Sequence, residues 1–370
     1  MFNIPLRLLL LPLCVIGIAL YLCCRMWKGM GVIPAVIWAA ISVSVIIWWI
    51  TVPRIFEINT PPGLAIIGYM YLPFTVFSFM LLFVADIIGI FILFMLGTRI
   101  NPKYKLLFAF MLTFAMFCYG YFEAKDIKTV EISIHTGKLP NDTDSIRIVQ
   151  ISDLHIGKIF DPKQLIKVMG IAGAASPDLI VLTGDIVDID LREDEYFVKI
   201  LGGVATSLGK FAVTGNHEHY AGFEQAVDFM SRAGYTVLHS EWYDLGPLVI
   251  AGVDDPGRSV VSKENEGYDL LSSLPDDLRN KFILFLKHQP HVHKDTIGLF
   301  DLQLSGHTHG GQIWPFRYIV SLLHGAGQGL SDHLGSLLYI SNGTGYWGPP
   351  VRFLTPPEVT IINVVQKQRT

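Results

Sequence analysis

The first third of the chain alternates long apolar runs with short groups of charged residues. Four uncharged runs of 17, 25, 28 and 17 residues fall before residue 123. Because a bilayer core about 30 Å thick takes roughly 20 apolar residues to cross as a helix, these runs predict transmembrane helices. We expect them near residues 6–24, 32–50, 64–97 and 105–122.

Three features of these runs allow a second interpretation. The third run is too long for one perpendicular span, so it is either tilted or lies in the membrane interface as far as Pro73. The first could also be a signal peptide, but it lacks a small-residue cleavage site and further spans follow it. Asp86 is an acid inside a predicted span, which makes it a functional candidate. We favour the plainer interpretation, in which Asp86 faces another helix or water.

Basic residues in the short loops predict the orientation. Arg25 and Lys28 follow the first span, and three basic residues between positions 99 and 105 follow the third. The loop at 51–63, by contrast, has one basic and one acidic residue. Basic loops stay in the cytoplasm, so the N-terminus and everything after Glu123 are predicted to lie outside.

From about residue 129 the pattern changes to short β-branched runs separated by Gly, Pro, Asp and Asn, with helical stretches between them. Such alternation predicts an α/β domain with layered sheets. The predicted strands are Val130–His135, Ile146–Ile151, Leu179–Leu182, Phe211–Thr214, Tyr235–Leu238, Leu248–Ala251, Phe282–Leu286, Leu302–Leu304, Leu337–Ile340 and Glu358–Val364. The predicted helices are Pro162–Ala175, Glu193–Leu208 and Gly222–Ala233.

Composition supports a division into a transmembrane region, 1–125, and a second domain, 126–370. The whole chain is 51% hydrophobic and only 16% charged. Its charge is about +5 up to Lys128 and about −9 beyond, and all 12 histidines lie at or after His135. The acidic second part excludes a basic nucleic-acid binder, so no nucleic-acid partner is expected. All four cysteines precede residue 119, which excludes a disulfide scaffold.

Metal-binding side chains follow five of the predicted strands. The motifs are Asp153-Leu-His155, Gly184-Asp185, Gly215-Asn216-His217-Glu218, His288 and Gly306-His307-Thr-His309. Strand ends converge on one point of a rigid scaffold, and carboxylate, imidazole and amide ligands without thiolate suit Mn, Fe or Zn. Residues two apart in extended backbone point the same way, which would direct each Asp-x-His or His-x-His pair to one side. The glycines would let the backbone turn close to the ions.

The ordered motifs resemble those of the calcineurin-like metallophosphoesterase superfamily over roughly residues 145–365. The stretch from Gly306 to Gln312 is similar to a membrane-attached prokaryotic branch. The resemblance implies a four-layer α/β/β/α sandwich, preceded here by an all-α transmembrane module. It also implies two divalent metal ions (Mn, Fe or Zn), bridged by one Asp and a hydroxide that attacks the phosphate ester.

Carried over by position, the resemblance implies seven metal ligands and one catalytic acid. The first ion takes Asp153, His155 and His309, Asp185 bridges, and Asn216, His288 and His307 complete the second. His217 would contact the phosphate and assist the leaving group. Two dications and two aspartates leave the site about +2, which favours a phosphate.

Three other features are open. Glu218 fits either a residue that orients a ligand imidazole or a helix-start carboxylate. The apolar stretch 313–323 fits a segment that touches the bilayer, one that receives an acyl chain, or a buried cap helix, and His324 and His333 could line a pocket. Asn342 stands where the related proteins often have Arg, so a phosphate-binding role there is not carried over.

The sequence therefore predicts a membrane-bound, metal-dependent phosphoesterase. A tethered site favours a phospholipid or a lipid-linked phosphate, with the lipid bilayer as partner. We expect a multi-pass protein of a bacterial cell membrane with an extracytoplasmic catalytic domain. Two alternatives remain open: an anchored phosphatase or phosphodiesterase for soluble substrates, and a non-enzymatic membrane sensor or transporter with a metal-binding domain.

Overall fold

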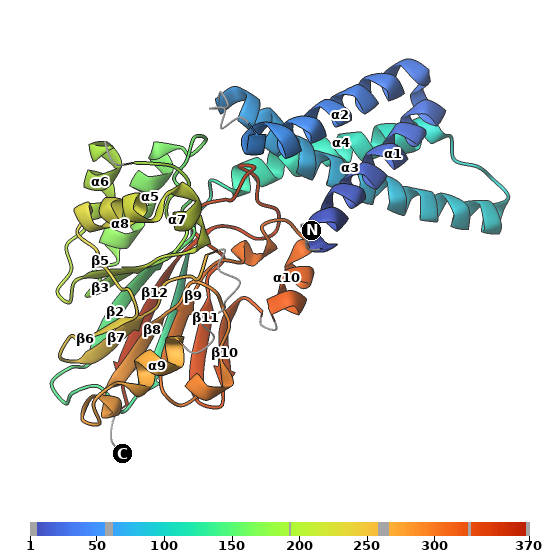
Figure 1. Ribbon diagram of the computed structural model, residues 1–370. Coiled ribbons are helices and arrows are strands. Elements are labelled where there is room, and N and C mark those ends of the chain that lie inside the picture. Colours follow the sequence, from blue (N-terminus) through green and yellow to red (C-terminus); the bar gives the residue numbers. More distant parts are fainter. Residues whose placement is uncertain (1–5, 56–61, 192–193, 258–265, 325–326, 368–370) are drawn as a thin grey trace. The chain divides into compact units, whose positions relative to one another are not determined.

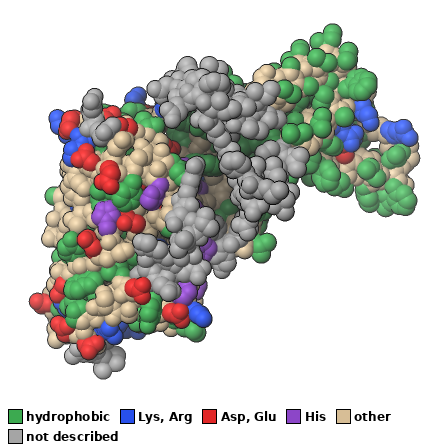
Figure 2. Space-filling view, in the orientation of Figure 1, with side chains coloured by type: hydrophobic (Ala, Val, Ile, Leu, Met, Phe, Trp, Pro, Cys, Tyr) green, Lys and Arg blue, Asp and Glu red, His purple; other side chains and the backbone are tan. Residues whose placement is uncertain are grey.

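The computed structural model describes residues 6–55, 62–191, 194–257, 266–324 and 327–367 (Figure 1). The chain divides into two compact units, Met1–Tyr119 and Gly120–Thr370. On the face shown in Figure 2, hydrophobic side chains predominate among the coloured side chains of the first unit, whereas acidic and histidine side chains lie on the second.

The first unit is helical wherever the structure describes regular elements. Its helices are α1 (Leu6–Met30), α2 (Val32–Ile55), α3 (Pro62–Leu96) and α4 (Pro102–Glu123), the last of which ends in the second unit. Among the described residues, Ile66–Leu96 and Pro102–Glu123 are long and apolar enough to cross a membrane. The predicted spans at 6–24 and 32–50 include residues whose side chains are not described, so both stay predictions. The described apolar part of α2, Val32–Val45, is shorter than a membrane span.

Asp86 of α3 faces other helices, which is the interpretation that the sequence favoured. Its carboxylate accepts a hydrogen bond from the Tyr21 hydroxyl at 2.5 Å and pairs with Arg25 and Lys105, each also at 2.5 Å. Arg25 lies within α1 and Lys105 within α4, so the prediction that both are loop residues is wrong. An apolar core that includes Leu22, Leu82 and Leu106 packs nearby. The positions of Arg25 and Lys105 are therefore better explained by their ion pairs with Asp86 than by the orientation of the chain in the membrane.

Two six-stranded sheets form the second unit. The first has the order β1-β12-β2-β3-β4-β5 and the second β10-β11-β9-β8-β7-β6. The strands of the first are β1 (Lys128–Thr136), β12 (Glu358–Gln366), β2 (Ser145–Ile151), β3 (Leu179–Thr183), β4 (Lys210–Val213) and β5 (Thr236–Val237). Those of the second are β10 (Gly329–His333), β11 (Ser336–Ile340), β9 (Leu302–Ser305), β8 (Phe282–Leu286), β7 (Leu248–Gly252) and β6 (Glu241–Asp244). All ten predicted strands are present, and β6 and β10 were not predicted.

The helices of this unit are short. They are α5 (Pro162–Ala174), α6 (Glu195–Gly202), α7 (Asn216–Ala221), α8 (Phe223–Arg232), α9 (Glu266–Ser272) and α10 (Phe316–His324). Asp161 caps α5 by accepting from the backbone N–H of Lys163, and Pro162 takes the first position, where a missing N–H costs nothing. The predicted helix to Leu208 is too long: α6 ends at Gly202, next to Gly203, because glycine pairs disfavour helix.

Three apolar cores hold these elements together. Ile148 and Val181 of the first sheet pack with Leu284 and Leu304 of the second in one core. The other side of the first sheet packs against α5, α6 and α8, and that of the second against α9. Strands such as Leu179–Thr183 are buried at every position, as expected of parallel strands covered on both faces. Parallel pairing brings the carboxyl ends of β2, β3 and β4 to one edge, and those of β8 and β9 likewise.

Candidate metal centre

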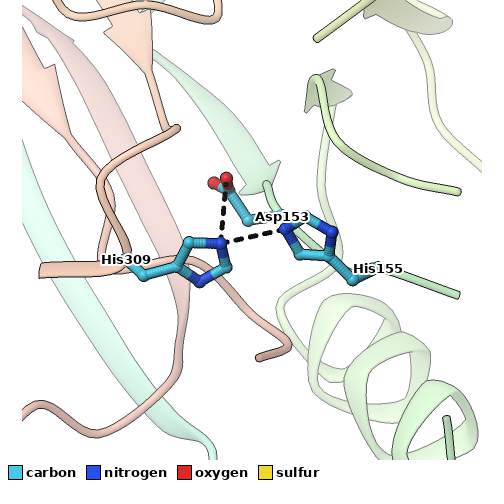
Figure 3. Close-up of side chains that lie close together, drawn as sticks. All are labelled: Asp153, His155 and His309. Carbon is cyan, nitrogen blue, oxygen red and sulfur yellow. Dashed lines mark hydrogen bonds and ion pairs between the residues drawn. The ribbon is translucent and has the colours of Figure 1, made fainter. Parts of the chain in front are cut away.

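Three overlapping groups of ligand atoms lie at these strand ends. Within each group the atoms are all within 4.8 Å of one another: Asp153, His155 and His309; His155, Asp185 and His217; Asp185, His288 and His307. Figure 3 shows the first group, whose side chains point toward one another from both sheets. The fold thus brings together seven of the eight residues that the sequence singled out, and Asn216 follows Gly215 at the start of α7.

The backbone at these residues is left-handed, which the sequence did not predict. The φ angles are +55° at Asp153, +52° at His155, +54° at Asp185, +73° at His307 and +49° at His309. Non-glycine residues rarely adopt this conformation, and it is concentrated at functional sites. The prediction that these pairs lie in extended backbone is therefore wrong. Asp153 and His155 do converge, whereas His307 and His309 belong to different groups.

Two glycines permit the close approach of the ligands, as predicted. A Cβ atom on Gly184, whose φ is +88°, would lie 2.5 Å from Nδ1 of His288. One on Gly306 would lie 2.0 Å from Oγ of Ser152 and 2.2 Å from Oδ2 of Asp153. Any side chain at either position would displace a ligand or its support.

The first donor set is arranged around His155 and His309. Their Nε2 atoms lie 2.9 Å apart, and Nε2 of His309 is 3.6 Å from Oδ1 of Asp153. Nδ1 of His155 donates to the Asp188 carboxylate, which leaves Nε2 as the lone-pair nitrogen directed at the centre. Buried ring nitrogens that face each other with a carboxylate beside them are the donors that a first-row divalent ion takes.

The second donor set lies between His288 and His307. Nδ1 of His288 donates to the carbonyl of Thr183 at 2.7 Å, so Nε2 points to Oδ2 of Asp185 at 3.1 Å and to Nδ1 of His307 at 3.2 Å. Oδ1 of Asn216 is buried and has no hydrogen-bond partner within the described part of the chain. An acceptor buried without a donor is expensive, and a cation would satisfy it, so these residues fit a metal ion.

Carboxylates and imidazoles strongly shift one another's pKa. Burial lowers the pKa of His288, but Asp185 and Asp153 outweigh burial and raise it to about 10. Burial likewise lowers the pKa of His155, and the nearby carboxylates, Asp188 first, raise it to about 9. Burial raises the pKa of Asp185, yet the histidines hold it well below its usual range. Protons on the imidazoles thus balance the negative charge of the buried carboxylates. A bound divalent cation would balance this charge in place of the protons.

Residues 146–311 match the calcineurin-like phosphoesterase family. A metallophosphoesterase of Aquifex aeolicus is 36% identical over 256 residues, which cover 67% of this chain and 96% of that protein. This chain belongs to the calcineurin-like phosphoesterase family. A Campylobacter jejuni metallophosphoesterase is 34% identical, with 65% of each chain covered. A zebrafish transmembrane protein with a metallophosphoesterase domain is 29% identical, over 70% of this chain and 62% of that one.

Membership makes this protein a phosphoester hydrolase of a family that uses divalent metals. The chain spans about two thirds of the length of the Campylobacter and zebrafish relatives. Candidate apolar helices and the name of the zebrafish relative suggest membrane association.

Asp188 is a residue of this phosphoesterase site that the sequence reasoning missed. Its Oδ1 atom accepts from Nδ1 of His155 and from Nδ1 of His217, at 2.8 Å each. Burial alone would raise the pKa of Asp188, but the two imidazoles hold it well below its usual range. Its place in the sequence was the one clue to this role, because Asp188 follows Asp185 by three residues on the same loop.

Glu218 supports the loop of Asp185 rather than an imidazole. It lies in the first turn of α7, which agrees with the helix-start interpretation. Its buried carboxylate accepts from the backbone N–H groups of Gly215 at 2.6 Å, Asp185 at 2.9 Å and Ile186 at 2.7 Å. Glu218 therefore joins the loops after β3 and β4.

Arg352 was also missed. Its side chain is fully buried and donates to the carbonyls of His309, Asn342 and Gly345. A further N–H of its guanidinium lies 3.1 Å from Nδ1 of His309. Asn342 donates to Glu358. Arg352 therefore holds the backbone around His309 in this metallophosphoesterase site.

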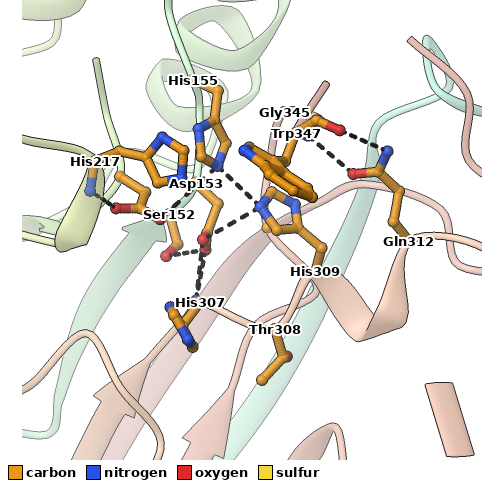
Figure 4. Close-up of polar contacts among 12 residues, drawn as sticks. Ser152, Asp153, His155, His217, His307, Thr308, His309, Gln312, Gly345 and Trp347 are labelled. Atoms are coloured by element: carbon orange, nitrogen blue, oxygen red, sulfur yellow. Dashed lines mark hydrogen bonds and ion pairs between the residues drawn. The ribbon is translucent and has the colours of Figure 1, made fainter. Parts of the chain in front are cut away.

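His217 lies close to two aromatic side chains, and Figure 4 shows it together with one of them, Trp347, among the polar contacts of the site. Its ring centroid is 5.1 Å from that of Tyr220 and 6.3 Å from that of Trp347, and both aromatics are about half exposed. His219 bonds to the backbone carbonyl of Asp255 and His239 to the carboxylate of Asp254, and neither belongs to the three donor groups. His333 lies on β10 near Ser331, and the side chain of His324 is outside the described residues.

Proposed function

We propose that this protein is a multi-pass membrane phosphoesterase with a binuclear metal centre, acting on a phospholipid or lipid-linked phosphate. The catalytic domain would be a four-layer α/β/β/α sandwich behind an all-α transmembrane module. The observation that carries the proposal is the pair of donor sets that share Asp185. Its carboxylate lies 3.9 Å from Nε2 of His155 on one side and 3.1 Å from Nε2 of His288 on the other.

Seven side chains would hold two divalent ions, Mn, Fe or Zn. Asp153, His155 and His309 suit one, Asn216, His288 and His307 the other, and Asp185 both. When bound, such ions activate water and stabilise charge on the phosphoryl group. The protein fixes these donors by hydrogen bonds. Asp188 holds His155, the carbonyl of Thr183 holds His288, and Glu218 holds the loop of Asp185.

His217 would deliver a proton to the leaving-group oxygen. Its Nδ1 donates to Asp188, so Nε2 is the nitrogen that can meet the substrate. The hydrogen bond to Asp188 holds the ring in this orientation. The His217 side chain is 16% exposed, so an ester at the surface can reach it.

A lipid phosphoester is the proposed substrate class because the domain continues from a candidate membrane helix, α4. Tethering an enzyme at the surface where its substrate resides raises the effective concentration of both. Lys28 in the last turn of α1, Arg99 between α3 and α4, and Lys103 at the start of α4 support a cytoplasmic position for these helix ends and an extracytoplasmic catalytic domain in a bacterial cell membrane.

The test is a substrate panel with metal analysis on the full-length protein in detergent. We expect about two Mn²⁺, Zn²⁺ or Fe²⁺ ions per chain and hydrolysis of lipid phosphoesters in mixed micelles. Asp185→Asn should lose metal and activity, whereas Asp244→Asn, on β6, should retain both. Stoichiometric metal without hydrolysis of any lipid or soluble ester would refute the enzyme, and activity on soluble esters alone would refute the lipid substrate.

A further inference from the structure

The second unit exposes large apolar side chains beside the metal centre. We call Trp314, Tyr318, Ile319, Leu322, Trp347 and Leu354 the apolar rim. Leu322 is 84% exposed and Tyr318 64% exposed, and both lie on α10. Scattered apolar residues on a surface are ordinary, but a contiguous set marks a contact surface.

Hydrogen bonds connect the segments that carry the rim. Trp314 donates its N–H to the carbonyl of Phe353, next to Leu354 in sequence. Trp347 is held through Gln312, whose side chain accepts from the Trp347 N–H and donates to its carbonyl. Gln312 immediately precedes Ile313 and Trp314, so one short segment connects α10 with both tryptophans.

One end of the rim adjoins the last turn of α4. The N–H of Leu354 donates to the Glu123 carboxylate at 2.7 Å, and the N–H of Arg352 donates to the carbonyl of Gly120 at 2.9 Å. A Cβ atom on Gly120 would lie 2.7 Å from the Arg352 carbonyl oxygen, so the contact is tight. This turn is where the candidate span Pro102–Glu123 ends.

The other end of the rim reaches the reacting groups. The Trp347 ring lies beside that of His217, and α10 follows ligand His309 after six residues. A molecule that contacts the rim at Trp347 therefore has its neighbouring atoms at the acid and the donor sets.

The chemistry of the rim favours a bilayer over a protein. Trp and Tyr prefer the headgroup boundary, and α10 is amphipathic, with Arg317 bonded to Gln328 while Ile319 and Leu322 are exposed. The last turn of α4 itself has the exposed Phe122, 70% accessible, followed by Lys125, an aromatic and basic pattern typical of a membrane border.

We propose that the apolar rim inserts into the headgroup region of the phospholipid bilayer and that Trp347 contacts the apolar part of a lipid whose phosphate enters the metal centre. This inference rests on the proposed function for its substrate. The membrane contact itself does not depend on catalysis.

Photocrosslinking tests the contact directly. Benzoylphenylalanine is placed at Leu322 in the full-length protein in phospholipid vesicles, and at Leu334 as a matched control. Leu334 is 90% exposed in the turn between β10 and β11. We expect a mass increase of one phospholipid at Leu322 only. Equal lipid labelling at both positions, or crosslinks from Leu322 to a second copy of the chain, would overturn the proposal.

Kinetics test the delivery of substrate. The measured quantity is kcat/KM for a phospholipid in vesicles divided by kcat/KM for a water-soluble ester. We expect this ratio to fall about tenfold in Leu322→Ser, because burying one Leu side chain strengthens an apolar contact by a factor of about ten or more. The ratio should be unchanged in Leu334→Ser. An unchanged ratio in Leu322→Ser would contradict lipid delivery. If the wild type hydrolyses neither ester, the proposed function fails, while the crosslinking result still decides the membrane contact.

Discussion

Oδ1 of Asp188 lies 2.8 Å from Nδ1 of His217. The same oxygen accepts from His155, a candidate metal ligand, at the same distance. One carboxylate thus orients a group that would hold metal and a group that would move a proton. Such shared support is efficient, but it means that loss of Asp188 affects both functions.

We predict that Asp188→Asn lowers kcat by about 100-fold, because His217 loses the carboxylate that orients its ring for proton transfer. The loss should be greatest for alkyl esters and much smaller for p-nitrophenyl esters, whose leaving group needs little protonation. Steady-state kinetics with the two ester types check this. An equal loss for both would indicate that Asp188 acts only through metal binding.

His217→Ala separates proton transfer from metal binding. His217 lies within reach of His155 and Asp185 but is proposed as the proton donor and not as a ligand, so the variant should keep about two metal ions while turnover falls by about 100-fold or more. Asp185→Ala should lose metal as well as turnover, because the Asp185 carboxylate lies beside both His155 and His288. Metal analysis by mass spectrometry together with kcat distinguishes them. Equal metal loss in the two variants would contradict this division of roles.

Arg352 positions His309 from behind. Its guanidinium donates to loop carbonyls that include those of His309, Asn342 and Gly345, and it lies against Nδ1 of His309 with no exposed surface. Arg352→Lys keeps the charge but not the forked geometry, so metal affinity should fall about tenfold and the free energy of unfolding by about 2 kcal/mol. Calorimetric titration of Mn²⁺ and thermal unfolding measure the two effects. The exposed Arg279→Lys is the control, and equal metal affinity in both variants would argue against the positioning role.

The sequence contained most of the fold because burial leaves a direct pattern. Strands such as Phe282–Leu286 are apolar at every position and are followed at once by polar residues, so both strand and ligand could be located. Short α7, α9 and α10 leave little periodicity, and only tertiary contacts define their ends. Sequence spacing indicated that Asp153 and His155 converge, but not that both have left-handed backbone.

Residues that support the site were harder to find than the ligands. Arg352 lies 43 positions from His309, and Asp188 is distinguished from other loop aspartates only by its contacts. Asp86 was visible as an intramembrane acid, but its partners Arg25 and Lys105 looked like loop cations because helix ends cannot be placed from apolar runs alone.

Metal removal should destabilise the second unit. Asp153, Asp185 and His288 are buried together, and a bound cation compensates their charges better than protons do. An ion at about 100 times its Kd adds about 2.7 kcal/mol to the free energy of unfolding. Thermal unfolding with Mn²⁺ and after chelation should therefore differ in Tm, and Asp185→Asn should lose most of the difference. The same Mn²⁺ response in that variant would mean that the ion binds elsewhere.

In the helical unit, Asp86 pairs with two cations on different helices, so the cluster has a net charge of +1. Asp86→Asn leaves both cations without their anion and should lower the free energy of unfolding by about 2 kcal/mol, between the values for exposed and buried ion pairs. Lys105→Met should cost more than Arg25→Gln, because the Lys105 side chain is 17% exposed and that of Arg25 is 33% exposed. Thermal unfolding in detergent gives the order. Tyr21→Phe removes a neutral hydrogen bond from the same carboxylate and should have the smallest effect. If Tyr21→Phe lowered the free energy of unfolding as much as Asp86→Asn, charge pairing would not be what joins these helices.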